Sequence, residues 1–178
     1  MQTLITDNLI LRDFSLGDAC DVYEYAQLDC VGSRAGWKPH KSLDESLAIV
    51  KNFILEQEVW AICLKQTGKV IGSVGLHKVN RDTGDYKVCY MGYVLNPCYW
   101  GKGYATQAGK AVQEYAFKIA KVNMLSVTHF EPNIQSKRVI QKLQFNFEAK
   151  LRNYGLYEGK LCNHCIYSLT KEEFFALN

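Results

Sequence analysis

A short glycine-containing segment, Trp100–Thr106, carries the residue types best suited to binding an anionic ligand. Gly101 and Gly103 lack Cβ atoms, so a bulky anion can approach the backbone there. The segment leads into an alanine-rich helical pattern, and the first N–H groups of a helix have no partners within the helix. These features suit a phosphate cradle, although the two glycines alone are equally typical of a plain strand-to-helix turn.

Two common phosphate-binding motifs are excluded at this segment. The dinucleotide-binding fingerprint needs a glycine or alanine at the position where this chain has Thr106. The P-loop needs Ser or Thr directly after Gly-Lys, whereas Gly101-Lys102 is followed by Gly103.

The same segment matches a third kind of phosphate-binding motif. Trp100-x-x-Gly103-x-Ala105, shortly after Asn96-Pro97, resembles the pyrophosphate-binding motif of the GNAT-type N-acetyltransferases. The family's usual Gln or Arg at the first position is Trp100 here, a change that removes one contact and leaves the backbone cradle. The resemblance implies acetyl-CoA as the co-substrate.

A second segment favours one branch of this family. Glu131–Phe145 is similar to the signature Asn-x-x-Ser-x-x-Val-x-x-Lys-x-Gly-Phe of the ribosomal-protein N-terminal acetyltransferases (RimJ/RimL-like), with Gln144 in place of the glycine. The run Trp100–Thr106 resembles the same branch. The likeness extends over nearly the whole chain, from Leu9–Asp13 to Ile166–Leu169.

The resemblance implies where acetyl-CoA would bind. A central strand splayed from its parallel neighbour would offer free backbone groups to the pantetheine amides, in the manner of an added strand. The backbone of the glycine segment would hold the pyrophosphate, and Lys137 and Arg138 are further candidates for phosphate contacts. The implied cofactor-binding residues are Tyr93, Val94, Leu95, Trp100, Gly101, Lys102, Gly103, Tyr104, Ala105, Thr106, Asn133 and Ser136.

Acetyl transfer to an amine needs a proton acceptor, oxyanion stabilisation and a donor to the departing thiolate. Ser136 resembles the branch's serine near the sulfur and is the predicted catalytic residue, with a helix-capping or surface serine as the alternative. Many relatives have a catalytic tyrosine seven residues after the asparagine, but this chain has Ile140 at that position. Some relatives have a carboxylate base in the strand before the asparagine, where this chain has Thr128. The proton acceptor is not assigned: the candidates are a water relay and five side chains, His77, His129, Glu131, Tyr154 and Glu158.

The acceptor pocket is predicted from two loops. By resemblance, the loop with Trp37 and His40 shapes one side, and Arg152–Tyr157 with Tyr154 shapes the other. Trp37 is equally suited to anchoring its loop in the core. Cys162 and Cys165 suggest half a metal site, but no second Cys/His pair has zinc spacing, so we expect no metal.

Hydrophobic periodicity predicts the elements that position these residues. Leu4–Arg12 is a strand broken at Asp7-Asn8; helices start at Ser15 and Ser42, with the loop Gly32–Lys41 between them. Three strands and a helix follow, then a strand, a helix and two strands. We expect an α+β fold, and the resemblance implies a mixed, mostly antiparallel central sheet of about seven strands flanked by helices on both faces. The predicted later elements are Val59–Leu64, Val70–Val79, a turn at Asn80–Asp85, Tyr86–Leu95, Ala105–Ile119, Met124–His129, Gln135–Leu143, Phe145–Arg152 and Leu161–Leu169.

Composition is that of an ordinary globular protein. The chain has 178 residues, 48% of them hydrophobic and 22% charged, and a net charge of +3. We therefore expect one domain spanning residues 1–178. The scattered basic residues predict no nucleic-acid partner, and no apolar run is long enough for a membrane span. Seven cysteines, an odd number, and the absence of a signal-peptide pattern predict reduced thiols and a cytoplasmic location.

Three functions remain open on this sequence. The first two are acetylation of a protein N-terminus and acetylation of a small amine. The third is a catalytically degenerate acyl-CoA-binding or sensor module, which the lack of an evident base keeps open. The sequence is compatible with a monomer or a homodimer.

Overall fold

One mixed sheet organises the chain. A computed structural model describes residues 1–79 and 84–177, and in these residues eight strands follow the order β1-β2-β3-β4-β5-β6-β8-β7. The strands are β1 (Leu4–Ile5), β2 (Leu9–Arg12), β3 (Val59–Leu64), β4 (Val70–Lys78), β5 (Val88–Leu95), β6 (Met124–Phe130), β7 (Asn146–Tyr157) and β8 (Lys160–Thr170).

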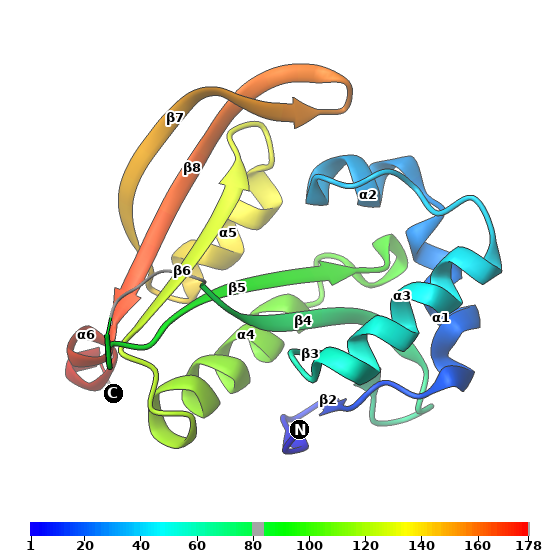
Figure 1. Cartoon of the computed structure of the whole chain (residues 1–178), viewed down its shortest axis with the longest axis horizontal. Helices are drawn as coiled ribbons and strands as arrows, with labels where there is room; N and C mark the ends of the chain where they lie inside the picture. The colour runs from blue at the N-terminus through cyan, green and yellow to red at the C-terminus, as the bar shows by residue number, and fades with distance from the viewer. Residues whose placement is uncertain (80–83, 178) are drawn as a thin grey trace.

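The parallel pair β5–β6 interrupts an otherwise antiparallel sheet. Among described residues, these strands pair only where Val88–Tyr90 faces Met124–Ser126. Beyond that point they diverge, as Figure 1 shows. β5 stays paired with β4 as far as Leu95, and β6 stays paired with β8 as far as Phe130. The split therefore leaves two free strand edges that face each other across a gap.

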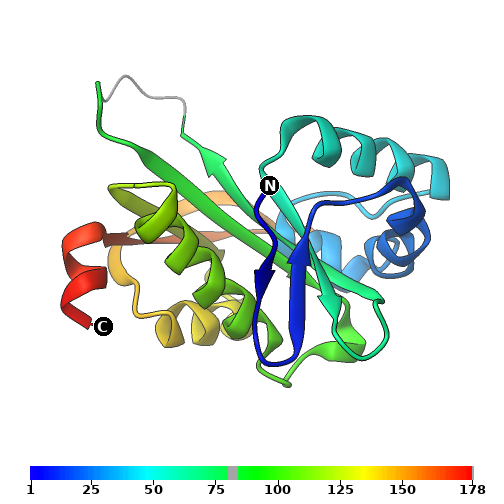
Figure 2. The ribbon, with the colours of Figure 1, turned by 90° about the horizontal axis from the view of Figure 1, so that it is seen from below.

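Helices cover both faces of this sheet. Helices α4 and α5 lie on one face and α1–α3 on the other, as the two views in Figures 1 and 2 show. A π-helical turn, Tyr115–Ile119, extends α4. The helices are α1 (Ala19–Ala26), α2 (Asp29–Ala35), α3 (Leu43–Glu56), α4 (Tyr104–Glu114), α5 (Ile134–Lys142) and α6 (Lys171–Leu177).

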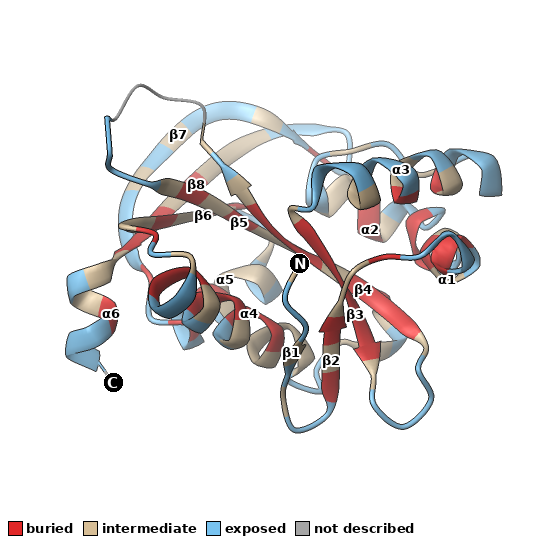
Figure 3. Ribbon diagram, turned by 60° about the horizontal axis from the view of Figure 1, so that its bottom comes forward, coloured by how far each residue is buried: buried red, intermediate tan, exposed pale blue. Residues whose placement is uncertain are grey.

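Two hydrophobic cores lie on the two faces of the sheet (Figure 3). Strand β3 contributes to both because its side chains alternate. Trp60 and Ile62 pack in the core beneath α4, whereas Ala61 and Cys63 pack in the core beneath α1 and α3. A strand buried on both faces is apolar throughout, which is why Val59–Leu64 reads as a continuous hydrophobic run.

Helix starts follow the predicted capping residues. The Ser42 hydroxyl accepts a hydrogen bond from the Glu45 N–H at 3.3 Å, and α3 begins at the next residue. Asp18 accepts from the Ser15 N–H at 2.7 Å where a 3₁₀ turn leads into α1. The predicted α+β fold is confirmed, and the break in Leu4–Arg12 accounts for the eighth strand.

The structure corrects the predicted loop between the first two helices and the last two predicted strands. The predicted loop Gly32–Lys41 begins inside helix α2. A Cβ on Gly32 would lie 2.7 Å from the Trp37 carbonyl oxygen, so glycine at this helical position allows the loop to pack closely on the helix. The last two strands are longer than expected, and helix α6 follows them. Of the predicted turn Asn80–Asp85, residues 80–83 lie outside the described residues.

No helix in the described part of the chain has the length and apolar character to cross a membrane. All seven cysteines, each within the described ranges, are free thiols. Within residues 1–79 and 84–177, no group of three His, Cys, Asp or Glu side chains is arranged to hold a metal ion.

Candidate active site

A cavity of about 860 Å³ lies where β5 and β6 diverge. This volume is within the range of small-molecule sites. All residues of β5 from Tyr90 to Leu95 contribute to its lining. Most of the predicted site residues line it: Trp37, Tyr93, Val94, Leu95, Trp100, Gly101, Gly103, Tyr104, Ala105, Thr106, Asn133, Ser136 and Tyr154.

The glycine turn at the cavity has a backbone that requires glycine. Gly101 has φ +75° and Gly103 has φ +80°, both in the left-handed region. Gly103 is the N-cap of α4, so the unpartnered N–H groups of that helix begin here. A Cβ built on either glycine meets no atom within 4 Å, so the space beside the turn is open. An open, amide-lined concavity at a helix N-terminus suits an anion.

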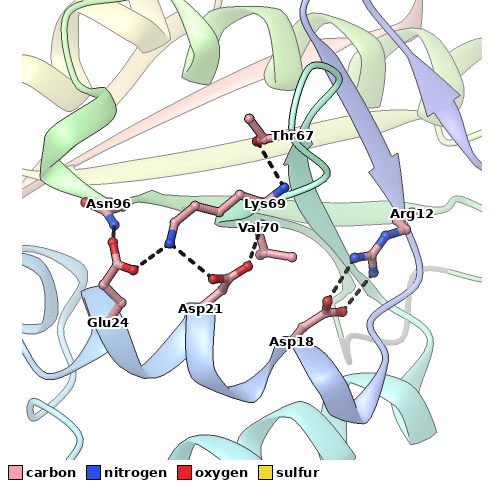
Figure 4. Close-up of polar contacts among 8 residues, drawn as sticks. All are labelled: Arg12, Asp18, Asp21, Glu24, Thr67, Lys69, Val70 and Asn96. Carbon is pink, nitrogen blue, oxygen red and sulfur yellow. Dashed lines mark hydrogen bonds and ion pairs between the residues drawn. The ribbon is translucent and has the colours of Figure 1, made fainter.

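Polar contacts around the buried Asn96 hold the start of this turn in place (Figure 4). Asn96 is buried; its amide donates to Glu24 of α1 at 2.8 Å, and its carbonyl oxygen accepts from the Cys98 N–H at 3.0 Å. Lys69 donates to the same Glu24 carboxylate at 2.6 Å. The hydrogen bond from Lys69, and then that from Asn96, hold the pKa of Glu24 below its usual value. The turn is thereby tied to the helical layer on the opposite face from α4.

Ser136 forms a close pair with the Tyr93 side chain. The two hydroxyl oxygens lie 2.8 Å apart, and the Tyr93 phenol also lies 3.1 Å from the Ser136 carbonyl oxygen. Burial raises the pKa of Tyr93, so its phenol is protonated at neutral pH. Asn133 caps α5 by accepting from the Ser136 N–H at 3.2 Å, so the Ser136 hydroxyl is not the cap. The sequence predicted only backbone contacts for Tyr93 and missed this phenol.

Arg34 of α2 is a second residue that sequence reasoning missed. Its guanidinium lies over the Trp100 ring at 5.2 Å and donates to Gln135 of α5 at 3.0 Å and to Glu158 at 3.3 Å. One side chain thus connects the glycine turn, α5 and the β7–β8 hairpin around the cavity. The helix that carries it has no apolar periodicity, so the sequence offered no signal for its position.

Aromatic side chains form the walls away from the glycine turn. The His164 ring stacks between Phe130, at 4.8 Å, and Tyr154, at 5.5 Å. Burial lowers the pKa of His164, which favours a neutral ring in this stack. On the other side, Trp37 packs directly on Gly32 of α2. Trp37 therefore both lines the cavity and anchors its loop.

Three predicted binding residues lie away from the cavity lining. His40 sits behind Trp37, where its Nδ1 lies 2.8 Å from the Ser46 hydroxyl. Lys102 extends over the Tyr99 ring at 5.1 Å. Lys137 lines a separate, smaller cavity, whereas its neighbour Arg138 lines the larger one.

Most of the candidate bases are engaged elsewhere. His129 is buried, with Nδ1 2.8 Å from the Phe130 carbonyl oxygen and Nε2 3.2 Å from the Tyr167 hydroxyl. Glu131 binds Lys150 and Asn163 outside the main cavity. Glu158 pairs with Arg34, and Tyr154 is 63% exposed. The fifth candidate, His77, lines the cavity, as do His129 and Tyr154.

Comparisons with known proteins show similarity in sequence and in fold. Residues 8–146 match the model of the acetyltransferase (GNAT) domain. The uncharacterised N-acetyltransferase p20 of Bacillus licheniformis is 27% identical over 98% of this chain and 99% of its own length. A GNAT-family acetyltransferase from Bacillus anthracis superposes with a TM-score of 0.87 at 23% identity, covering 97% of this chain and all of that one. RimJ of Mycobacterium smegmatis, solved with CoA-disulfide, superposes with a TM-score of 0.81 at 17% identity, covering 97% and 88% of the two chains.

Proposed function

Because the chain belongs to the GNAT acetyltransferase family, we propose that it transfers an acetyl group from acetyl-CoA to a primary amine by direct attack in a ternary complex. One observation carries this proposal. The free edge of β5, the open glycine turn and the N-terminus of α4 meet at a single cavity. Backbone groups, a phosphate cradle and a helix dipole are together the features that an extended, anionic thioester requires.

The cofactor side of the cavity fits acetyl-CoA through its backbone. The edge of β5 at Tyr93, Val94 and Leu95, unpaired on the side of β6 in the described chain, would bind the pantetheine amides. The N–H groups of Gly101–Thr106 would bind the pyrophosphate, for which the space beside the two glycines is open. Arg138 and Lys142 line the same cavity and would add positive charge. Bound there, acetyl-CoA supplies the thioester that the amine attacks.

Ser136 and Tyr93 would serve the departing sulfur. A hydroxyl that donates to developing negative charge stabilises the transition state more than the ground state. The Tyr93 phenol, buried and protonated, can pass a hydrogen bond through Ser136 because the two oxygens are 2.8 Å apart. We therefore assign Ser136 as the catalytic donor and Tyr93 as the residue that positions it.

The cavity lining favours an acceptor that has a single amine and is otherwise flat and weakly charged. None of the described residues that line the cavity is Asp or Glu, whereas Arg34, Arg138 and Lys142 do line it. A polyamine or an aminoglycoside would bring several positive charges without carboxylates to receive them. The stack of Phe130, His164 and Tyr154 instead offers apolar faces. A peptide N-terminus and a small aromatic monoamine both fit this description, and the RimJ/RimL-like motifs favour the peptide.

Ligand-dependent melting tests the cofactor assignment first. Acetyl-CoA at a hundredfold excess over its dissociation constant should stabilise the protein by about 2.7 kcal/mol, which corresponds to about 5–10 °C in Tm for a chain of this size. NADH and ATP should shift Tm far less. An equal shift with ATP contradicts the cofactor assignment.

Turnover against a panel of amines tests the reaction. The panel should contain peptides, aromatic monoamines and polyamines, and products should be detected by mass spectrometry because the protein's seven thiols interfere with thiol-reactive dyes. We expect acetylated peptides or monoamines and little acetylated polyamine. Acetyl-CoA binding with no turnover across the panel would instead support the acyl-CoA-binding module.

A further inference from the structure

The floor of the cavity is built from a cross-strand pair of glycines. Gly75 of β4 pairs with Gly92 of β5, and the next pair on the same face is His77 with Tyr90. All four residues line the cavity. Since both members of the first pair lack side chains, the rings of His77 and Tyr90 can approach them closely.

The His77 ring lies over Gly75. Its Nε2 lies so close above Gly75 that a Cβ built on that glycine would be 2.3 Å away. The ring centroid is 6.5 Å from that of Tyr90, whose hydroxyl lies 3.1 Å from the Thr128 hydroxyl on β6. The imidazole thus sits on the cavity face of the sheet, near the point where the strands separate.

Glu58 fixes which nitrogen of His77 is free. The Nδ1 atom lies 3.1 Å from the Glu58 carboxylate, which accepts but cannot donate a hydrogen bond when ionised. Nδ1 therefore carries the proton, and Nε2, over the glycine floor, presents a lone pair. The His77 side chain is 39% exposed and that of Glu58 is 28% exposed, so the ring can exchange protons with solvent.

We propose that His77 is the catalytic base of the transfer and that Glu58 is its positioning residue, an inference that rests on the function proposed above. Nε2 takes one proton from the acceptor ammonium, and the freed lone pair forms the C–N bond at the thioester carbon. As the C–S bond breaks, the second proton of the nitrogen passes to the thiolate by way of Ser136. Protonated His77 then returns its proton to solvent, so one proton is released for each acetyl group transferred.

Other titratable groups of the described chain face His77 or line the same cavity. Glu58 faces the ring from the start of β3, and Tyr90 faces it from β5. Arg34 of α2 and Lys142 of α5 line the same cavity. Glu58 contacts the ring directly, in the way a carboxylate orients a catalytic histidine in other enzymes.

The variant His77→Gln tests the proposal, because its amide can still donate to Glu58 but cannot accept the proton. With the best amine from the panel at pH 7, we expect kcat to fall by about 100- to 10,000-fold. The variant's rate should then rise about tenfold per pH unit, following the fraction of neutral amine, and should approach the wild-type rate above the pKa of the amine. A fluorinated analogue of the acceptor, neutral at pH 7, should largely abolish the difference.

Two readouts besides turnover separate this role from a structural one. The acetyl-CoA-induced shift in Tm should be unchanged in His77→Gln. Glu58→Gln should lose less activity than His77→Gln and should shift the nitrogen NMR signals of His77 away from the Nδ1–H tautomer. The control variant Glu56→Gln, at the exposed end of α3, should keep both the activity and the His77 signals of the wild type.

The outcomes separate a failure of the base assignment from a failure of the proposed acetyltransferase function. If the wild type turns over and His77→Gln keeps both its rate and its pH profile, the base assignment is overturned while the acetyltransferase stands. If the wild type acetylates no amine in the panel, both proposals fall together.

Discussion

The two sides of the cavity are built from different parts of the polypeptide. Around Gly101–Thr106 two glycines leave open space beside the backbone, on one continuous stretch of chain from β5 into α4. Around Trp37 and Tyr154 the surface consists of side chains from segments more than a hundred residues apart. Backbone groups are common to every sequence, so the first side suits a constant ligand, whereas the second can change its acceptor by substitution.

This difference predicts which substitutions affect which substrate. Changes in the glycine turn should affect acetyl-CoA alone, and changes in the aromatic wall should affect the amine alone. Ser136 lies between the two sides and should affect the rate.

The largest effect is expected for Gly103→Asp. The carboxylate would enter the open space where phosphate charge belongs, and the positive φ adds about 1 kcal/mol of backbone strain. Acetyl-CoA should no longer shift Tm, although the protein stays folded. Gly68→Asp is the matched control, since Gly68 has φ +72°, equally open surroundings and a position in the β3–β4 turn. Normal binding by Gly103→Asp would place the phosphate site elsewhere.

Ser136→Ala should reduce turnover by roughly 10- to 1,000-fold, the range for loss of one general-acid or oxyanion-type donor. The KM for acetyl-CoA should stay within a few-fold, because the interaction strengthens only in the transition state. Stability should change little, since Asn133 caps the helix and the Tyr93 phenol keeps the Ser136 carbonyl as a partner. Turnover and Tm measured on one preparation check this. A destabilised variant with unchanged turnover would make Ser136 structural.

Tyr154→Ala should act on the acceptor alone. Tyr154 is 63% exposed and stacks on His164, so its loss should cost little stability. Removing one aromatic face from the acceptor wall should raise the acceptor KM about three- to tenfold. The KM for acetyl-CoA should not move. An effect on acetyl-CoA with none on the amine would reverse the assignment of the two sides.

The smallest effect is expected at Gln144, which belongs to neither side. It has φ +61°, a conformation that glycine adopts without strain. Gln144→Gly should therefore stabilise the protein by about 0.5–1 kcal/mol and raise Tm by a few degrees, with both KM values unchanged. Gln141→Gly, inside helix α5, should shift Tm in the opposite direction.

The elements around the glycine turn could be predicted because local pattern determines them. The strand predicted at Tyr86–Leu95 is found at Val88–Leu95, and the helix predicted from Ala105 begins at Tyr104. The strands predicted at Val59–Leu64 and Val70–Val79 are found at Val59–Leu64 and Val70–Lys78, since their apolar runs end at turn-forming residues.

The acceptor side was less predictable because it depends on long-range contacts. Helix α2 carries Arg34 but holds Gly32 and no helical apolar stripe; it is stabilised by tertiary packing against Trp37. The pairing of Tyr93 with Ser136 joins residues 43 positions apart. The pairing of His77 with Glu58 depends on the register of β3 and β4, which the sequence does not specify to one residue.

The divergence of β5 from β6 also has a consequence for folding. The pairs from β1 to β5 all join strands that are neighbours in sequence, so this half of the sheet can form as soon as residues 1–95 have been synthesised. The parallel junction must wait for the crossover through α4, and such non-local pairing is slow. Until then the whole edge of β5 is exposed, and an exposed strand edge is a template for aggregation. A ligand that covers this edge should therefore raise the yield of refolded protein as well as its stability.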